Sequence, residues 1–244
     1  MNNIIPSLRK ALQLIRQLSE KNCTQAELSQ KLHITMSTTY RILRTLLAEG
    51  WIVKKADSSY TLGGGMLLLL ASFHRDVAQM EILRDIVAEI PAKTGLFAKL
   101  SIPCGNLHHV TLHYAAPEEE YMLFADKPGT VFPVSGDPAG IALLLDKTPG
   151  QLGDLCAASG GTPKPEALLQ AVEKCKKKGY LLDCVGKSRW QVMEMALPLR
   201  FEGKIIASLA VLGCAEDFAG VRERRIFKVV KDFAAKCEKA VAGA

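Results

Sequence analysis

Apolar residues recur at intervals of three and four through the first fifty positions, the spacing of helices that bury one face. The first run begins after Pro6 and Ser7, residues that favour a helix start. The second opens at Thr24, and Glu27 three positions later completes a capping box. The third ends at Gly50, a residue that readily takes the left-handed conformation of a helix end. The pattern therefore predicts three short helices in succession.

The third predicted helix has two chemically different faces. One face packs and is almost wholly apolar: Thr39, Ile42, Leu43, Leu46 and Leu47. The other carries hydroxyls and guanidinium groups, where Glu and Lys would suffice for a helix that is only solvated. Such side chains reach phosphates and base edges in a DNA groove. The residues expected to contact DNA are Ser37, Thr38, Thr39, Tyr40, Arg41, Arg44 and Thr45.

The pattern after Gly50 shortens to two extended runs around Asp57-Ser58-Ser59, which predicts a hairpin. Lys54 and Lys55 lie on its first arm, where we expect them to contact phosphates. Three helices followed by such a hairpin form a winged helix-turn-helix, whose second turn helix enters the major groove. This arrangement favours a recognition helix over the alternative of a solvated amphipathic helix.

The rest of the chain mixes helical and extended patterns. A predicted amphipathic helix ends at Gly95, and two late strands are joined at Glu202-Gly203. The predicted strands include "LFAKLSI", "HHVTLHYA", "YMLFAD", "QVMEMALPL" and "KIIASLAVLG". Helices are predicted at "DPAGIALLL" and "PEALLQAVEKCKKKG" and at the end of the chain. Together these elements predict an α/β domain with a largely antiparallel sheet, and an α+β protein of two domains overall.

The joint between the domains falls near "LGGGMLLLLASFHRD". Three glycines at 63–65 argue against regular structure there, and the apolar run after them predicts a helix too hydrophobic to be solvated. That helix is either a dimerisation element or a core helix of the second domain. We therefore expect a DNA-binding domain at 1–62, a linker or dimerisation helix at 63–80 and a second domain at 81–244.

Positive charge is concentrated in the first quarter of the chain. Residues 1–62 hold nine Lys and Arg against four Asp and Glu, a net charge of +5, whereas the remainder holds 22 against 21. A local positive field of this kind is typical of a nucleic-acid-binding module. The total composition, 48% hydrophobic and 23% charged, is that of an ordinary globular protein.

Targeting and disulfide signals are not apparent in the sequence. The pattern lacks an apolar run of about 18 residues and a signal peptide, so we expect no membrane partner. Seven widely spread cysteines without a CxxC pair favour reduced thiols and a cytoplasmic location.

The sequence offers little support for a metal site or a catalytic site. His109 and His113 in "HHVTLH" would share a strand face but lie about 13 Å apart, too far for one metal ion without further ligands. We expect these histidines to lie near the surface. Phosphate-loop, nucleophile-elbow and zinc-protease motifs are missing, and Cys175 between two lysines is the one suggestive thiol. We therefore expect no metal, no cofactor and no enzymatic activity.

The segments "STTYRILRTLLAEGWIV" and "YTLG" resemble the DNA-binding domain of IclR-type transcriptional regulators. The resemblance continues through "PGTVFPVSGDPAGIALLL", "KKGYLLD" and "EMALPLRFEGKIIASLAVLG" in the family's order. It implies a winged helix-turn-helix and a linker helix, followed by a GAF-like domain that binds a small effector. It also implies homodimers, which associate further into tetramers, and repression or activation of operons. His33 departs from the glycine that members often have at the turn, although His tolerates left-handed geometry better than most residues.

The same resemblance implies an effector pocket in the second domain. The positions that line this pocket in the family correspond here to Pro138, Ala139, Asp183, Glu194, Ala210 and Leu212. Ser208 is two residues before Ala210 on the last strand, so it would face the same side. Glu194 would repel an anionic effector, which favours an aromatic, amine-bearing or largely apolar ligand. Asp183 and Glu194 are alternatively ordinary surface carboxylates.

Two functions remain open at this point. The first is a regulator that binds operator DNA and responds to a small-molecule effector. The second is a small-molecule-binding or enzymatic α/β domain whose winged helix serves protein contacts. The charge distribution and the polar face of the third helix favour the first.

Overall fold

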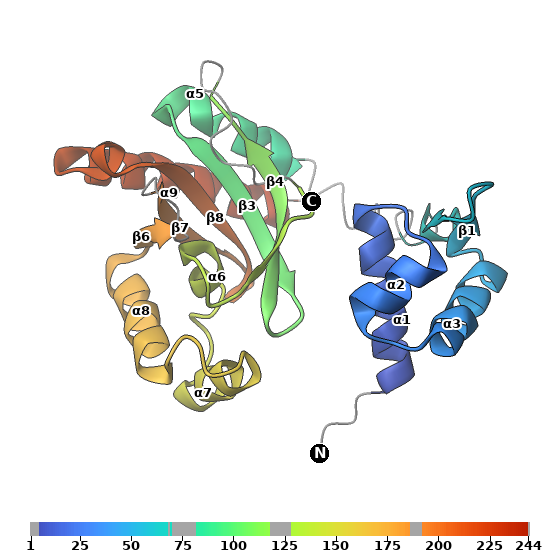
Figure 1. Ribbon diagram of the computed structural model, residues 1–244. Coiled ribbons are helices and arrows are strands. Elements are labelled where there is room, and N and C mark those ends of the chain that lie inside the picture. The colour runs from blue at the N-terminus through green and yellow to red at the C-terminus, as the bar shows by residue number, and fades with distance from the viewer. Residues whose placement is uncertain (1–4, 68, 70–81, 118–127, 186–191, 244) are drawn as a thin grey trace. The chain divides into compact units, whose positions relative to one another are not determined.

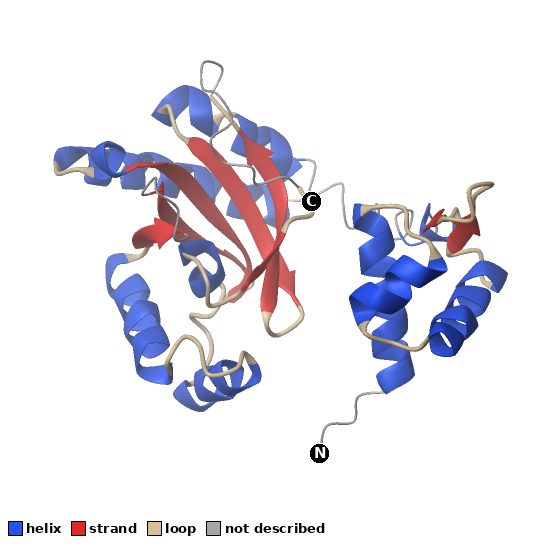
Figure 2. Ribbon diagram, viewed as in Figure 1, coloured by secondary structure: helices blue, strands red, loops and turns tan. Residues whose placement is uncertain are grey.

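The computed structural model describes residues 5–67, 69, 82–117, 128–185 and 192–243 (Figures 1 and 2). The chain divides into two compact units, residues 1–77 and 78–244. Each unit has its own hydrophobic core. Within the described ranges, none of the helices combines the length and the apolar character that crossing a membrane requires. Residues 121–126, predicted as a strand, and most of the helix predicted within 63–80 lie outside the described residues.

The first unit is a winged helix-turn-helix, as the sequence predicts. Its helices are α1 (Pro6–Glu20), α2 (Gln25–Leu32) and α3 (Met36–Ala48). Its hairpin pairs β1 (Ile52–Lys54) with β2 (Tyr60–Leu62) in antiparallel register. The Thr24 capping box is present, and His33 ends α2 in the left-handed conformation with φ of 51°. A single core of apolar side chains from all three helices and both strands holds the unit together.

Close backbone contact explains two of the glycines at 63–65. The Gly65 N–H donates to the Gly50 carbonyl oxygen at 2.9 Å. A Cβ at Gly63 would lie 2.5 Å from that same oxygen, so a side chain there would displace the backbone. Helical structure already begins at Gly65, however, so the expectation of irregular structure across all three glycines is wrong at the third.

The second unit is built on a six-stranded sheet in the order β5-β4-β3-β8-β7-β6, and every described neighbouring pair is antiparallel. The strands are β3 (Phe97–Cys104), β4 (His108–Ala115), β5 (Val131–Pro133), β6 (Leu181–Val185), β7 (Val192–Phe201) and β8 (Lys204–Cys214). The central strands alternate between two buried faces, so both faces of the sheet are covered.

Different helices cover the two faces of this sheet. One face, which includes Leu100 and Leu209, packs against α9 (Val221–Ala242) and the helical residues 82–88. The opposite face carries Ala196 and Ala210, which pack against α6 (Pro138–Ala142). Beside α6, α7 (Pro149–Ala158) and α8 (Pro165–Lys178) share a second cluster with the start of β6. A 3-10 turn, η1 (Ala215–Phe218), precedes α9.

Two helices differ from the sequence prediction. The helix predicted to end at Gly95 is interrupted at Glu89, and α5 (Ile90–Thr94) follows as a separate turn. Pro91 explains the break, because it has no N–H to continue the helical hydrogen bonds. Helix α7 was not predicted, although Thr148 and Gln151 form a capping box at its start.

Candidate nucleic-acid interface and effector site

Helix α3 presents most of its predicted DNA-contacting side chains to solvent. Those that are exposed are Ser37, Tyr40, Arg41, Arg44 and Thr45, whereas Thr38 is half-buried. The Arg44 guanidinium lies 6.0 Å from the centroid of the Tyr40 ring, so these two side chains form one surface. The exposed face therefore combines hydroxyls, an aromatic ring and two guanidinium groups.

Thr39 is an exception and corrects the sequence prediction. Its side chain has 0% exposure, and its hydroxyl donates to the Thr35 carbonyl oxygen at 3.0 Å. The helical periodicity already placed Thr39 on the packed face with Ile42 and Leu43. Thr39 therefore belongs to the core of the unit and does not face DNA.

A groove of about 410 Å³ runs between α1 and α3. Its polar edge comes from α3 and includes Thr38, Arg41 and Thr45. Leu8 and Ala11 of α1 give it an apolar lining. Arg41 is thus one of the residues that line this groove.

The hairpin carries its lysines on an exposed arm. Lys54 and Lys55 are both exposed. Asp57 holds the turn, since its Oδ1 accepts from the Ser59 N–H at 3.0 Å and from the Ser59 hydroxyl at 2.6 Å. These hydrogen bonds lower the pKa of Asp57 below its ordinary value. The turn geometry is therefore fixed locally, and both lysines remain available to an anionic partner.

A cluster of charged side chains lies buried in the second unit. Lys99 of β3 is 1% exposed and Glu194 of β7 is 0% exposed. Lys99 Nζ lies 2.8 Å from Glu194 Oε2 and 3.4 Å from Asp137 Oδ2. His109 Nε2 of β4 lies 2.9 Å from Asp137 Oδ1. Four segments distant in the sequence thus contribute to one ionic cluster.

Backbone groups complete this buried cluster. The Ala139 N–H donates to Glu194 Oε1 at 2.7 Å, and the Gly140 N–H donates to Asp137 Oδ1 at 2.7 Å. A Cβ on Gly140 would overlap the Val134 carbonyl oxygen, so glycine is required for this close approach. The loop that enters α6 is therefore fitted tightly against the buried charges.

The two carboxyl groups of the cluster are shifted in opposite directions. Burial raises the pKa of Glu194 to about 7, against the opposing effect of the Lys99 ammonium. Burial also acts to raise the pKa of Asp137, but its bond from His109 and the charge of Lys99 lower it below its ordinary value. Burial thus brings the pKa of Glu194 into the neutral range, whereas that of Asp137 stays in the acidic range.

The structure brings together most of the predicted effector residues. Glu194 contacts the Ala139 backbone, next to Pro138, and Ala210 packs with Ala139 in a cluster of small residues. Leu212 is opposite Glu194 in the sheet register, and Ser208 lies two residues before Ala210 on the same strand. Asp183 is also opposite Glu194, on β6, but its side chain is exposed. Asp183 thus lies at the margin of this group.

The ion pair corrects the interpretation of Glu194. The sequence suggested either a surface carboxylate or a free pocket carboxylate that repels anions. Glu194 is instead wholly buried and bound to Lys99. Glu194 is therefore neither a surface carboxylate nor an unpaired pocket carboxylate.

A row of buried hydroxyls crosses three strands next to this cluster. Ser101 of β3 is opposite Ser208 of β8 on one side and Thr111 of β4 on the other. Among the described residues, none of these three hydroxyl oxygens has a hydrogen-bond partner. Since buried polar groups are normally satisfied, the row is suited to a polar ligand or water.

The histidines of β4 do not share a face. A bulge opposite Leu100 and Ser101 pairs His113 with Leu100 and Thr111 with Ser101. This shift places His113 on the face opposite His109. His109 itself is 0% exposed, so the expectation of surface histidines is wrong there. Within the described residues, no three metal-ligating side chains gather into a possible metal site.

Cys175 does not have the character of a reactive thiol. It is 0% exposed, and burial raises the pKa of its thiol to about 11. The flanking lysines of α8 therefore do not activate it.

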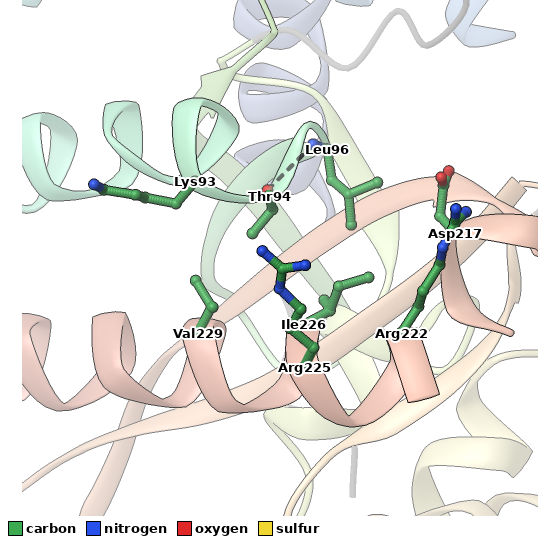
Figure 3. A pocket seen from close by; sticks show the side chains of 8 residues that line it. All are labelled: Lys93, Thr94, Leu96, Asp217, Arg222, Arg225, Ile226 and Val229. Carbon is green, nitrogen blue, oxygen red and sulfur yellow. Dashed lines mark hydrogen bonds between the residues drawn. The ribbon is translucent and has the colours of Figure 1, made fainter. Parts of the chain in front are cut away.

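A separate surface hollow of about 210 Å³ lies between α5 and the start of α9 (Figure 3). In Figure 3 the Arg225 guanidinium points toward Thr94, and Arg222 lies beside Asp217. The hollow is on the α9 side of the sheet, whereas Glu194 and Ala210 face α6. None of the predicted effector residues lines it.

Sequence reasoning missed Lys99 and Asp137 as members of the site. The signal for Lys99 was present, because it is a single charge within the otherwise apolar run "LFAKL". Asp137 directly precedes Pro138 and caps α6, so its signal was that of an ordinary helix start.

Comparison with known proteins agrees with both units. Residues 7–56 match the IclR helix-turn-helix domain. The transcriptional repressor IclR of Escherichia coli K12 is 21% identical over 189 residues, which cover 73% of this chain and 69% of that protein.

Solved structures share the fold over nearly the whole chain. A putative IclR transcriptional regulator from Silicibacter sp. TM1040 has a TM-score of 0.82 at 20% identity, covering 98% of this chain and 97% of that one. An IclR homolog from Microbacterium hydrocarbonoxydans, complexed with 4-hydroxybenzoate, has a TM-score of 0.77 at 15% identity, covering 98% and 100%. The Escherichia coli relative is named a transcriptional repressor, and the Silicibacter protein a putative transcriptional regulator. Residues 7–56 of this chain therefore form an IclR helix-turn-helix domain, and the chain as a whole has the fold of these solved IclR-type structures.

Proposed function

We propose that this regulator recognises a specific operator through α3 and that a small molecule bound in the second unit sets its operator affinity. The observation that carries the proposal is the exposed face of α3, which offers hydroxyls and two guanidinium groups. The proposed DNA contacts are Ser37, Thr38, Tyr40, Arg41, Arg44 and Thr45, with Lys54 and Lys55 on phosphates. Thr39 is left out because it is buried.

The proposed division of labour follows the sequence boundaries. Residues 1–62 bind DNA, residues 63–80 link and dimerise, and residues 81–244 bind the effector. A homodimer would present two copies of α3 to half-sites about 34–36 Å apart. For such a dimer we expect a palindromic operator.

The effector is proposed to lie on the α6 face of the sheet. The buried hydroxyl row of Ser101, Thr111 and Ser208 supports a polar ligand there. The complex of a structural relative with 4-hydroxybenzoate supports a small molecule of aromatic size. The proposed lining residues are those of the sequence analysis: Pro138, Ala139, Asp183, Glu194, Ser208, Ala210 and Leu212.

The deciding experiment is fluorescence anisotropy of the full chain on its own upstream DNA and on random DNA across a salt series. We expect tighter binding to the upstream DNA and a steep loss of affinity with salt. Equal binding to both sequences would contradict operator recognition. It would support a winged helix that serves protein contacts instead.

Two variants separate base recognition from phosphate contact in the same assay. Arg41→Ala is expected to cost about 1–3 kcal/mol on the upstream DNA and less on random DNA, because a base contact is sequence-specific. Lys54→Ala is expected to weaken both equally and to lower the salt slope by about one. Lys177→Ala removes an exposed charge from α8 and serves as the control without effect. Equal losses from Arg41→Ala on both DNAs would exclude base reading by Arg41.

A further inference from the structure

Two buried donors hold the carboxylate of Glu194, one at each oxygen. These donors, the Lys99 ammonium and the Ala139 N–H, are called the receptor below. Lys99 Nζ is 2.8 Å from Oε2, and the Ala139 N–H is 2.7 Å from Oε1. The side chain of Glu194 is 0% exposed and that of Lys99 is 1% exposed. A buried ammonium and a buried amide N–H, spaced to suit a carboxylate, would bind any carboxylate that reached them.

Other contacts hold this receptor in place besides Glu194. Lys99 Nζ also lies 3.4 Å from Asp137 Oδ2 and 5.1 Å from the centroid of the Phe132 ring. Asp137 is itself fixed by the Gly140 N–H at 2.7 Å, which orders the loop that bears Ala139. The two donors therefore keep their positions when the Glu194 carboxylate is removed.

We propose that Glu194 is an internal ligand of this receptor and excludes external carboxylates from it. The inference rests on the proposed effector site, since the receptor lies among those lining residues. An external carboxylate would be a third one at the Lys99 ammonium, after Glu194 and Asp137, which disfavours its ionisation there. Glu194 thus determines specificity: the effector of this chain places a neutral polar group, not a carboxylate, next to Lys99.

The test is to empty the receptor and supply a carboxylate of matching size. Glu194→Ala removes a methylene and a carboxylate, a group with the dimensions of acetate. At pH 8, calorimetric titration of the full-length variant with sodium acetate is expected to show binding, with sodium chloride at equal ionic strength as reference. Wild type is expected to bind acetate about ten-fold or more weakly, because its receptor is already occupied.

Matched variants identify the receptor. Asp183→Ala removes the exposed carboxylate opposite Glu194 in the sheet register and should gain no acetate binding. Lys99→Met combined with Glu194→Ala should lose the binding that Glu194→Ala gained. Benzoate is larger than the vacancy and should bind Glu194→Ala more weakly than acetate does.

Several outcomes would overturn the proposal. Acetate binding to wild type as tight as to Glu194→Ala would show that Glu194 does not exclude carboxylates. If the alanine variant does not fold, Glu194→Ser replaces it in the same titration, since its hydroxyl can accept from the Ala139 N–H. If neither variant folds with or without acetate, the receptor does not keep its shape alone, which contradicts the second step of the argument. None of these titrations uses DNA, so a failure of operator binding and a failure of the receptor are scored independently.

Discussion

A lysine ammonium buried within a sheet is costly unless its charge is compensated, and Lys99 meets this condition through carboxylates from two other segments. Glu194 is the sensitive member of the pair, since burial raises the pKa of its carboxyl group to about 7. In the unfolded chain the same group has an ordinary pKa near 4.5. At the scale of single residues, this difference links the stability of the second unit to pH.

The sign of this linkage is fixed by the raised pKa. Between pH 4.5 and about 7 the folded protein holds a proton on Glu194 that the unfolded chain has released. The stabilisation is therefore complete below pH 4.5 and is lost as pH rises through about 7. Lys99, Asp137 and the opposing Asp183 are the charged groups that face Glu194, and the pKa of Asp137 is lowered, which puts its titration outside this range.

Denaturant unfolding from pH 5 to pH 8 measures this effect. We expect the free energy of unfolding of wild type to fall with rising pH relative to that of Glu194→Gln, by on the order of 2–3 kcal/mol at most. A difference that stays constant over this range would mean that Glu194 keeps an ordinary pKa.

Secondary-structure elements in both units depend on single backbone positions. His33 ends α2 with φ of 51°, a conformation that glycine adopts without strain. His33→Gly is therefore expected to raise the free energy of unfolding by a few tenths of a kcal/mol, whereas His33→Val should lower it by about 1 kcal/mol or more. Urea denaturation followed by circular dichroism measures both. Equal stabilities for the two variants would contradict the requirement for a left-handed backbone conformation at position 33.

Gly140 in α6 has a different constraint, since a Cβ there would overlap the Val134 carbonyl and lie 2.9 Å from the His109 ring. Gly140→Ala is expected to destabilise the second unit by about 2 kcal/mol or more, because the added methyl has no room. Gly153→Ala in α7 is the matched control: nothing lies within 4 Å of its added Cβ. That control should stabilise by about 0.5–1 kcal/mol through helix propensity. Thermal unfolding of both variants compares the two effects directly.

The sequence predicts correctly those features that depend on residues close together in the chain. Helical spacing, the Thr24 capping box and the left-handed turn at His33 are all short-range, and the structure confirms them. The bulge in β4 depends on the register with β3, and so the shared face expected for His109 and His113 was wrong. Lys99 and Glu194 are 95 positions apart, and no short-range pattern pairs them. The ion pair of Lys99 with Glu194 was therefore beyond sequence reasoning, whereas the exposed face of α3 was not.

At the scale of the whole molecule, each unit has its own hydrophobic core, in which Leu14 and Leu209 are both 0% exposed. We expect a core substitution to affect only the unit that contains it. Leu14→Ala should destabilise the first unit and Leu209→Ala the second, each by about 2–5 kcal/mol. The transition temperature of the affected unit should fall accordingly. Differential scanning calorimetry resolves the transitions. Equal shifts of a single transition in both variants would show that the units unfold as one.

The separation of Lys99 from Glu194 also bears on how the chain is made. At about 5–20 residues per second, a ribosome synthesises Glu194 roughly 5–20 s after Lys99, because 95 residues separate them. The helix-turn-helix is complete by residue 62, before either charge has emerged. The first unit of a nascent chain can therefore fold well before Glu194 is available to pair with the buried Lys99 of the second unit. Between the emergence of β3 and that of β7, the nascent chain thus carries Lys99 without its partner Glu194.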